Sequence, residues 1–204
     1  MVLSIILLLN LGFSAQANSE DKSKEIDVIY SKLINVLPEG SELVALPYVE
    51  ELSVYGRKAK GKLDKKSDAI GGKAYVVKAK KGKNPWDAGV NNVLFKSVKK
   101  GDVLHFTFFA KAVKLPKGQD SIELKSVGVQ KSSEPYNTLF GNDVTLNETW
   151  QSFTFAGTAD RDYDAQELQA SFQVATDTQT IAFGPLLIFN VGNGVDISTL
   201  PYVK

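Results

Sequence analysis

Apolar and polar side chains alternate with a period of two along most of this chain. The clearest run is Val103–Val113, which follows a Lys-Lys-Gly-Asp turn. Its apolar set consists of Leu104, Phe106, Phe108 and Ala110. Because successive side chains of a β-strand point to opposite faces, this run predicts a long strand with one buried face.

The same pattern predicts further strands, separated by turns rich in Gly, Pro, Asn and Asp. The predicted strands are Leu52–Tyr55, Lys73–Ala79, Ala88–Phe95, Val103–Val113, Ile122–Gln130, Leu139–Leu146, Gln151–Gly157, Leu168–Ala175 and Thr180–Asn190. No helical run separates them, so the predicted fold class is all-β, an antiparallel β-sandwich. The segment Arg57–Gly72, rich in Lys, Gly, Asp and Ser, is expected to be a mobile crossing between strands.

The pattern changes near the N-terminus. Apolar residues three and four positions apart predict a short amphipathic helix over Glu20–Leu37. Before it, the apolar block Val2–Phe13 and the small residues up to Ala17 are typical of a secretory signal cleaved after Ala17. This block is shorter than the ~20 apolar residues of a membrane span, and a retained N-terminal anchor is the alternative.

These features predict the organisation of the chain. Residues 1–17 form a signal peptide, residues 18–40 a helical lead-in and residues 41–204 one domain. The expected location is secreted or periplasmic, with no membrane span after signal cleavage.

The composition excludes several kinds of site. With no Cys and one His, the chain can form neither disulfides nor a zinc site of three or four His and Cys ligands. The sequence also lacks a phosphate-binding loop, a dinucleotide fingerprint and the Gly-x-Ser-x-Gly elbow of serine hydrolases.

Charge is distributed unevenly along the chain. Arg57–Lys100 contains fourteen Lys or Arg and three acidic residues, a net charge of +11, whereas Glu134–Lys204 contains two and nine, a net charge of −7. One interpretation is solvated strand edges and loops, because lysine on an edge strand discourages aggregation. The other is a basic rim that attracts an anionic glycan or the cell envelope. Nucleic acid is not an expected partner, because aromatic and basic residues are not interleaved on a defined face.

Four pieces of sequence occur in a characteristic order. They are Gly71–Val77, Asn84–Asp87 followed by Gly101–Ala112, Thr149–Phe155, and Ala170–Ala175 with Ile181–Pro185. Together they resemble the carbohydrate-binding modules of the cellulose- and xylan-binding jelly-roll superfamily, of the family 4, 9, 16 and 22 type, which are galactose-binding-domain-like. The resemblance covers Leu43–Gly192. It implies a jelly roll that binds a polysaccharide or oligosaccharide. It also implies no required cofactor, although members often carry a structural calcium ion.

The alternating pattern also assigns faces to the strands. Polar and aromatic side chains opposite the apolar sets, with residues of nearby loops, are predicted to line one concave sheet; Ser171 shares this face. The predicted ligand-binding residues are Trp86, Asp87, Asn91, His105, Phe109, Lys111, Tyr136 and Gln173. Sugar hydroxyls both donate and accept hydrogen bonds, which suits Asp, Asn, Gln and His. An aromatic ring offers a flat surface to the C–H face of a pyranose.

Several of these residues have a structural alternative. Alternation places Trp86 on the apolar face of its strand with Ala88 and Val90, so it can instead seal the edge of the sandwich. Phe109 can pack beneath the N-terminal helix. His105 can be an internally hydrogen-bonded residue, and Lys111 can form an ion pair with Asp87.

Two loops are also open to more than one interpretation. Tyr136 and Phe140 follow Pro135 and can reach over a cleft or anchor their own loop. Asp160, Asp162 and Asp164 alternate along the chain, which suits the oxygen ligands of calcium but equally a solvated turn.

The sequence nominates no catalytic residue. Glycosidases generally use two carboxylates ~5–10 Å apart, and Asp87 has no acidic companion on the proposed face. We therefore expect a secreted, non-catalytic module that binds a polysaccharide. One alternative is a structural or protein-interaction domain of the cell envelope, with its concave face covered by the helix Glu20–Leu37. The other is a small glycan-active hydrolase or lyase, the lyase using His105, Lys111 and Tyr136.

Overall fold

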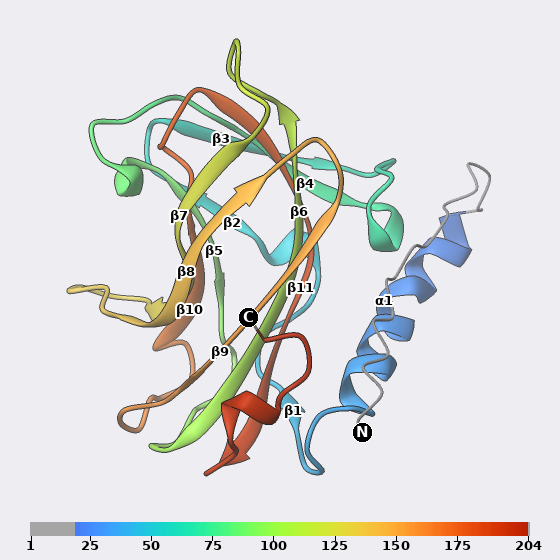
Figure 1. The fold of residues 1–204 in the computed structure, drawn as a ribbon, viewed down its shortest axis with the longest axis vertical. Coiled ribbons are helices and arrows are strands. Elements are labelled where there is room, and N and C mark those ends of the chain that lie inside the picture. Colours follow the sequence, from blue (N-terminus) through green and yellow to red (C-terminus); the bar gives the residue numbers. More distant parts are fainter. Residues whose placement is uncertain (1–18, 204) are drawn as a thin grey trace, which may run out of the picture.

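The computed structural model describes the backbone of residues 19–203, with side chains from residue 25 onward. Within this range two antiparallel sheets pack face to face, and one helix, α1 (Ser19–Ile34), lies outside them (Figure 1). Sheet A follows the order β3-β4-β11-β6-β9, with β1 added beside β11, and sheet B follows β2-β5-β10-β7-β8.

The strands of sheet A are β1 (Glu42–Leu43), β3 (Ala59–Asp64), β4 (Ala74–Ala79), β6 (Asp102–Lys114), β9 (Gln151–Thr158) and β11 (Gln179–Asn193). Those of sheet B are β2 (Ser53–Tyr55), β5 (Gly89–Val93), β7 (Ile122–Lys131), β8 (Thr138–Leu146) and β10 (Leu168–Gln173). The short 3-10 helices are η1 (Val49–Glu51), η2 (Ile70–Gly72), η3 (Pro85–Asp87) and η4 (Ile197–Thr199).

The fold class predicted from the sequence is confirmed. Each predicted strand overlaps a strand of the structure, and the predicted N-terminal helix is α1. The predicted signal peptide, residues 1–17, lies outside the described residues. Within the described part of the chain, no helix is long and apolar enough to cross a membrane.

The expectation of a mobile crossing over Arg57–Gly72 was wrong. This segment contains β3, which pairs with β4 along its whole length at the edge of sheet A. Alternate positions of β3 are lysines, and the apolar residues that face the core are small or few, so the strand has a weak hydrophobic signal. Backbone pairing with β4 therefore holds this strand in place more than burial does.

Phenylalanine rings from both sheets form the centre of the sandwich. Phe172 of β10 packs against Phe108 of β6 and Phe183 of β11, with ring centroids 4.9 Å apart in both pairs. All three side chains are 1 % exposed. Burial of one such side chain contributes about 1.5–3 kcal/mol, so these contacts hold the two sheets together.

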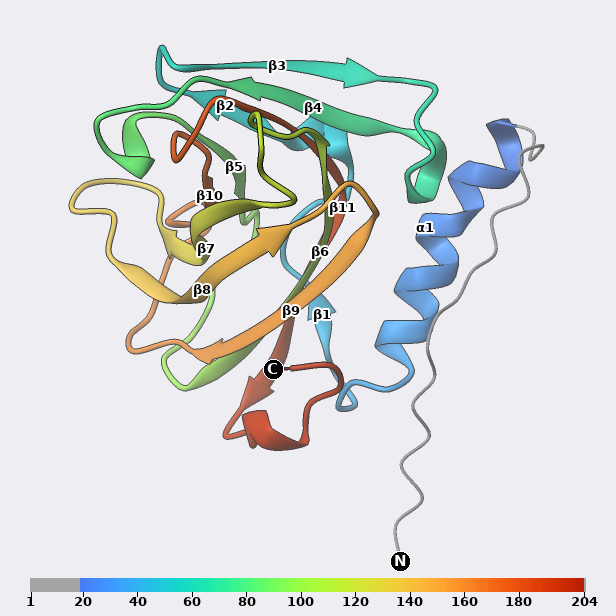
Figure 2. The ribbon, with the colours of Figure 1, turned by 45° about the horizontal axis from the view of Figure 1, so that its top comes forward.

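A second apolar cluster lies on the outer face of sheet A. It joins Leu33 of α1, Leu187 and Phe189 of β11, and Leu200 of the C-terminal segment. The ring of Tyr30 stacks on Phe189 with centroids 5.7 Å apart. Figures 1 and 2 show α1 beside sheet A, on the side away from sheet B. One outer face of the sandwich is therefore covered, and no described helix or strand covers the other.

Candidate functional site

The uncovered face of sheet B carries neutral polar side chains. Val90, Val129 and Phe172 point into the core, so the residues that alternate with them point outward. We define the sheet B face by its outward residues Tyr55, Asn91, Gln130, Gln169, Ser171 and Gln173. Each can form hydrogen bonds with a sugar hydroxyl.

Strand register arranges these residues in three adjacent rows across the sheet. The rows are Tyr55–Gly89–Gln173, Asn91–Ser171–Gly128 and Val93–Gln169–Gln130. The middle row must remain small, because a Cβ atom added at Gly128 would lie 2.1 Å from the carbonyl oxygen of Phe140. The two outer rows therefore carry longer side chains than the middle row between them.

Two oxygen atoms of the middle row are buried without a hydrogen-bond partner among the described residues. They are Oδ1 of Asn91 and Oγ of Ser171. Buried polar atoms in folded proteins are normally paired, and leaving one unpaired costs about 1–3 kcal/mol. These two buried atoms therefore keep unused hydrogen-bonding capacity, and a ligand hydroxyl or a water molecule pairs with them only after the covering side chains shift.

Tyr55 places an aromatic ring beside these atoms. A Cβ atom added at Gly89 would lie 2.4 Å from ring atoms of Tyr55, so the ring lies directly over this glycine. Burial raises the pKa of the Tyr55 phenol above its usual 10.0. The nearby Ser171 hydroxyl acts in the opposite direction, although no hydrogen bond joins the two groups, and the Tyr136 phenol raises the pKa further. Tyr55 therefore remains a hydrogen-bond donor at neutral pH, with Tyr136 close to it.

Charged groups lie at the margin of the sheet B face. Lys125, the Cα partner of Gln173, bridges Glu123 and Asp143 with Nζ–O distances of 2.7 and 2.8 Å. Hydrogen bonds from Lys125 to Asp143 and Glu123 raise the pKa of this lysine. The six outward residues include no acid, so the groups that they offer to a ligand are neutral hydrogen-bonding groups.

Three predicted ligand-binding residues lie on this side of the molecule. Asn91 and Gln173 are half-buried members of the sheet B face. Tyr136 is 49 % exposed and belongs to the loop between β7 and β8. This loop and η3 project from the same side of the sandwich in Figures 1 and 2.

Trp86 and Asp87 belong to η3, immediately before β5. The alternating pattern placed Trp86 on the apolar face, but it is 58 % exposed because the 3-10 turn interrupts the extended backbone. The Asp87 carboxylate accepts hydrogen bonds from the backbone N–H groups of Asn84 at 3.1 Å and Lys83 at 2.7 Å, which lower its pKa. Asp87 thus stabilises its own turn, and Trp86 is the side chain that a ligand can reach.

The other three predicted residues lie on the outer face of sheet A. His105 is fully buried, and its Nε2 atom donates to the carbonyl oxygen of Pro201 at 3.0 Å. Burial lowers the pKa of His105, so the ring is neutral at pH 7. Phe109 packs against the cluster beneath α1. The prediction that one face collects all these residues was therefore wrong, because alternation does not show which sheet a strand joins.

Lys111 is held on the same side by a different acid from the one expected. Its Nζ atom lies 2.9 Å from both carboxylate oxygens of Asp68 and 5.0 Å from the ring centroid of Trp150. The indole of Trp150 also donates to Asp68 at 3.0 Å. The three residues form one cluster on sheet A, so His105, Lys111 and Tyr136 do not share a site.

Tyr55, Gln130 and Gln169 were not among the residues predicted from the sequence. Gln130 and Gln169 are Cα partners on β7 and β10, and both alternate with buried apolar residues. Their sequence signal was the same alternation that nominated Gln173. Tyr55 ends a strand of three residues, which is too short to establish a period.

The acidic loop does not gather its carboxylates. Asp160 accepts a hydrogen bond from the Tyr163 hydroxyl at 2.6 Å, and Asp162 accepts one from the backbone N–H of Lys100 at 2.8 Å. Among the described residues, no group of three or more His, Cys, Asp or Glu is placed to hold a metal ion. This loop therefore does not fit calcium, and a calcium ion elsewhere stays a prediction.

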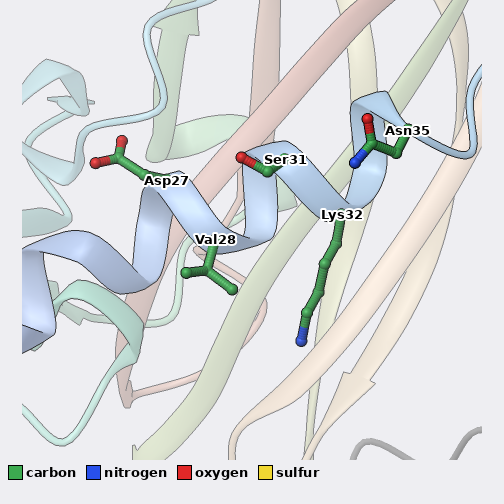
Figure 3. Close-up of a pocket in the computed structure, with 5 residues that line it drawn as sticks. All are labelled: Asp27, Val28, Ser31, Lys32 and Asn35. Carbon is green, nitrogen blue, oxygen red and sulfur yellow. The ribbon is translucent and has the colours of Figure 1, made fainter.

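Two hollows lie outside the six residues of the sheet B face. Figure 3 shows the first, whose described lining residues all lie along the exposed side of α1. The second measures about 270 Å³ and is lined by Leu46, Glu51, Asn92, Val93, Phe95 and Gln166. Because Val93 is the Cα partner of Gln169, this second hollow continues the sheet B face with a more apolar surface.

The fold is similar to those of several solved carbohydrate-binding modules. A structure described as "CBM4 structure and function" has a TM-score of 0.53 and 20% identity, covering 68% of this chain and 94% of that chain. The CBM22-1 xylan-binding domain of Paenibacillus barcinonensis Xyn10C has a TM-score of 0.54 and 13% identity, covering 76% and 94%. A further xylan-binding domain of family 22 has a TM-score of 0.52 and 15% identity, covering 78% and 100%. At these identities the likeness shows the fold alone.

The family of this chain is identified from its sequence. No curated protein matches the chain. The family model described as "Carbohydrate binding domain" matches residues 48–180, which is more than half of the chain and spans all of sheet B. With a jelly-roll sandwich whose uncovered sheet presents neutral hydrogen-bonding groups, this chain belongs to the carbohydrate-binding domain family.

Proposed function

We propose that this chain binds a polysaccharide on the sheet B face without altering it chemically, and that it does so as a secreted or periplasmic protein. The observation that carries this proposal is the pair of unpaired oxygen atoms on Asn91 and Ser171 beside the ring of Tyr55. A pyranose stacked on an aromatic ring brings its hydroxyls to neighbouring polar atoms.

The accessible groups fit this mode of binding. Tyr55, Asn91 and Gln173 are half-buried, and Tyr136 is largely exposed, so a sugar reaches them without unfolding the sheet. Since none of these side chains is charged at neutral pH, the face favours a neutral polymer. Two of the similar structures are named as xylan-binding domains, so xylan is the first polymer to test.

The two alternative functions lack a comparable observation. A structural or interaction domain of the envelope was expected to cover its concave face with the N-terminal helix. α1 does cover part of the predicted face, at Phe109 on sheet A, but it leaves the sheet B face open. The lyase hypothesis needs His105, Lys111 and Tyr136 together, and they lie on opposite faces of the sandwich. Association with the cell envelope remains compatible with polysaccharide binding.

Affinity electrophoresis in gels containing xylan, cellulose derivatives or mixed-linkage glucan tests the proposal. Removing a stacking ring costs about 0.5–1.5 kcal/mol, so Tyr55→Ala and Tyr136→Ala should each weaken binding by about twofold to tenfold. The matched control is Tyr202→Ala, because Tyr202 is 59 % exposed beside Pro201 on the sheet A side. Equal loss in all three variants, or retention by no polymer, would contradict the proposal.

The absence of catalysis and the export of the chain need separate measurements. Prolonged incubation with each retained polymer should release no new reducing ends and no unsaturated product. Sequencing the N-terminus of the exported protein should identify Asn18 as the first residue. Melting with and without a chelator tests the calcium prediction.

A further inference from the structure

Exposed lysines form a regular array at the edge of sheet A. We define the lysine ladder as Lys58, Lys60, Lys62, Lys78, Lys80 and Lys114. Lys60 and Lys78 are direct Cα partners on β3 and β4, and the register continues through Thr180 of β11 to Lys114 of β6. The backbone N–H of Lys80 donates to the carbonyl oxygen of Lys58 at 2.8 Å, which extends the pairing by one step. Figure 2 shows the β3–β4 ribbon at the outside of the sandwich.

None of the ladder lysines is held in an ion pair in the described part of the chain, although Lys58 lies close enough to Asp87 to interact with it electrostatically. All six side chains are exposed. Other lysines do form ion pairs, Lys73 with Glu50 and Lys96 with Glu42. Two acids near the ladder in sequence, Asp64 and Asp87, accept hydrogen bonds from backbone N–H groups of their own turns, and a third, Asp68, pairs with Lys111. Most of the ladder's positive charge is therefore not used in ion pairs and is available to an external anion.

Protection of an edge strand explains only part of this arrangement. Lysines on β3 discourage another chain from pairing with that edge. Lys78, however, lies on β4, which is already paired on both sides, and it stands directly opposite Lys60. Like charges at directly opposed positions destabilise a sheet, so protection of the edge gives no reason for a second lysine there.

We propose that the lysine ladder binds an acidic polysaccharide that lies along β3 and β4. Side chains two residues apart on a strand are about 6.6–6.8 Å apart, and directly opposed ones are about 5 Å apart, so the ladder matches a linear polymer with repeated negative charges. This surface belongs to the other sheet, so the proposal does not depend on glycan binding at the sheet B face.

The side chains present favour a carboxylated or sulfated polymer over other polyanions. The ladder consists of lysines, whereas arginine is the residue that recognises phosphate and nucleic acid with paired hydrogen bonds. Neither β3 nor β4 exposes a large apolar or aromatic side chain. Such side chains anchor proteins in the membrane interface or stack on unpaired bases, so lipid surfaces and single-stranded nucleic acids fit less well.

The test compares the full chain with two charge-matched double variants. Binding to polygalacturonate is measured by affinity electrophoresis and calorimetry at low and high salt. Lys60→Glu combined with Lys78→Glu should weaken this binding at least about tenfold, because two attractions become repulsions, and added salt should weaken wild-type binding. The control is Lys32→Glu combined with Lys100→Glu, which changes the net charge equally at exposed sites on α1 and just before β6, at the end of that strand opposite Lys114. This control should bind polygalacturonate like the wild type.

Three results would overturn the proposal. They are no binding of polygalacturonate by the wild type, an equal loss in the control variant, and tighter binding to anionic phospholipid vesicles or to oligothymidylate than to polygalacturonate. The ladder variant is also tested on a neutral polymer that the wild type binds. If it still binds that polymer, its loss of polygalacturonate binding does not come from failure of the sheet B face. Conversely, Tyr55→Ala should leave polygalacturonate binding unchanged.

Discussion

The two outer faces of the sandwich are built from the same kind of alternating strand but have opposite environments. On sheet A, α1 and the C-terminal segment bury Phe189, and Pro201 supplies a partner for His105. On sheet B, Asn91 and Ser171 keep buried oxygen atoms without a partner among the described residues, and neither α1 nor the C-terminal segment packs there. Unpaired atoms occur on both faces, because Nδ1 of His105 also lacks a partner among the described residues. The faces differ in that packing buries His105 completely, whereas Asn91 and Gln173 on sheet B are half-buried.

The largest expected effect lies on the covered face. Phe189→Ala should lower the free energy of unfolding by about 3–5 kcal/mol, because it leaves a cavity between β11 and α1. Urea unfolding followed by tryptophan fluorescence measures this change, and polysaccharide affinity of the folded variant should remain that of the wild type. Phe95→Ala, at a ring that is 41 % exposed, is the control and should cost much less. A loss below about 1 kcal/mol for Phe189→Ala would mean that α1 does not pack tightly on sheet A.

Two adjacent asparagines of β5 allow a hydrogen-bonded polar side chain to be compared directly with an unpaired one. Asn92 is buried and donates to the carbonyl oxygen of Leu46 at 3.0 Å, whereas Oδ1 of Asn91 has no partner among the described residues. Asn92→Ala should lower stability by about 0.5–1.5 kcal/mol, because it removes the hydrogen bond that the buried Asn92 side chain donates. Asn91→Ala should leave stability nearly unchanged and weaken polysaccharide binding by about tenfold, or 1.4 kcal/mol. If Asn91→Ala instead lowered stability and Asn92→Ala weakened binding, the proposed site would be contradicted.

Acid should affect the two faces differently. The folded-state pKa of His105 lies below its usual 6.5 because of burial, so the unfolded chain binds a proton first as the pH falls. The stability that depends on neutral His105 is present above about pH 6.5 and is lost as the pH falls through the folded-state pKa. Thermal melting from about pH 7 to about pH 5 measures this loss, which His105→Gln should reduce. Polysaccharide binding by the folded protein should stay constant over that range, because no outward residue of the sheet B face titrates there.

The smallest expected effect concerns the open edge of sheet A. Lys60→Glu replaces a like-charge pair with Lys78 by an opposite-charge pair, which should raise the free energy of unfolding by about 0.2–1 kcal/mol. Lys62→Glu is the control, because the Cα partner of Lys62 is Val76. Urea unfolding at low salt measures the difference between the two variants. If Lys60→Glu were less stable than Lys62→Glu, the opposed lysines would not repel each other in the folded protein.

Much of the fold could be predicted because alternation is a local property of the backbone. It identified Leu104, Phe106 and Phe108 as core residues, and all three are at most 1 % exposed. It failed at Trp86, where a 3-10 turn changes the direction of the chain, and at β3, whose outward lysines outnumber its large apolar residues.

The candidate site was harder to predict, because it depends on which strands become neighbours. Asn91 and His105 both alternate with buried apolar residues, yet one joins sheet B and the other joins sheet A. The position of Tyr55 over Gly89 arises from a pairing between residues 34 positions apart in the chain. No local pattern encodes such a pairing, so Tyr55 could be recognised only in the folded structure.

The contact between Tyr55 and Gly89 has a further consequence. A ring resting on a bare backbone has given up its rotational freedom during folding, so a ligand does not have to immobilise it. Ordering a flexible side chain on binding costs about 0.5–1.5 kcal/mol of conformational entropy. If Tyr55 binds the sugar as proposed, Gly89 raises affinity without touching it, and a residue that has no side chain sets part of the binding strength.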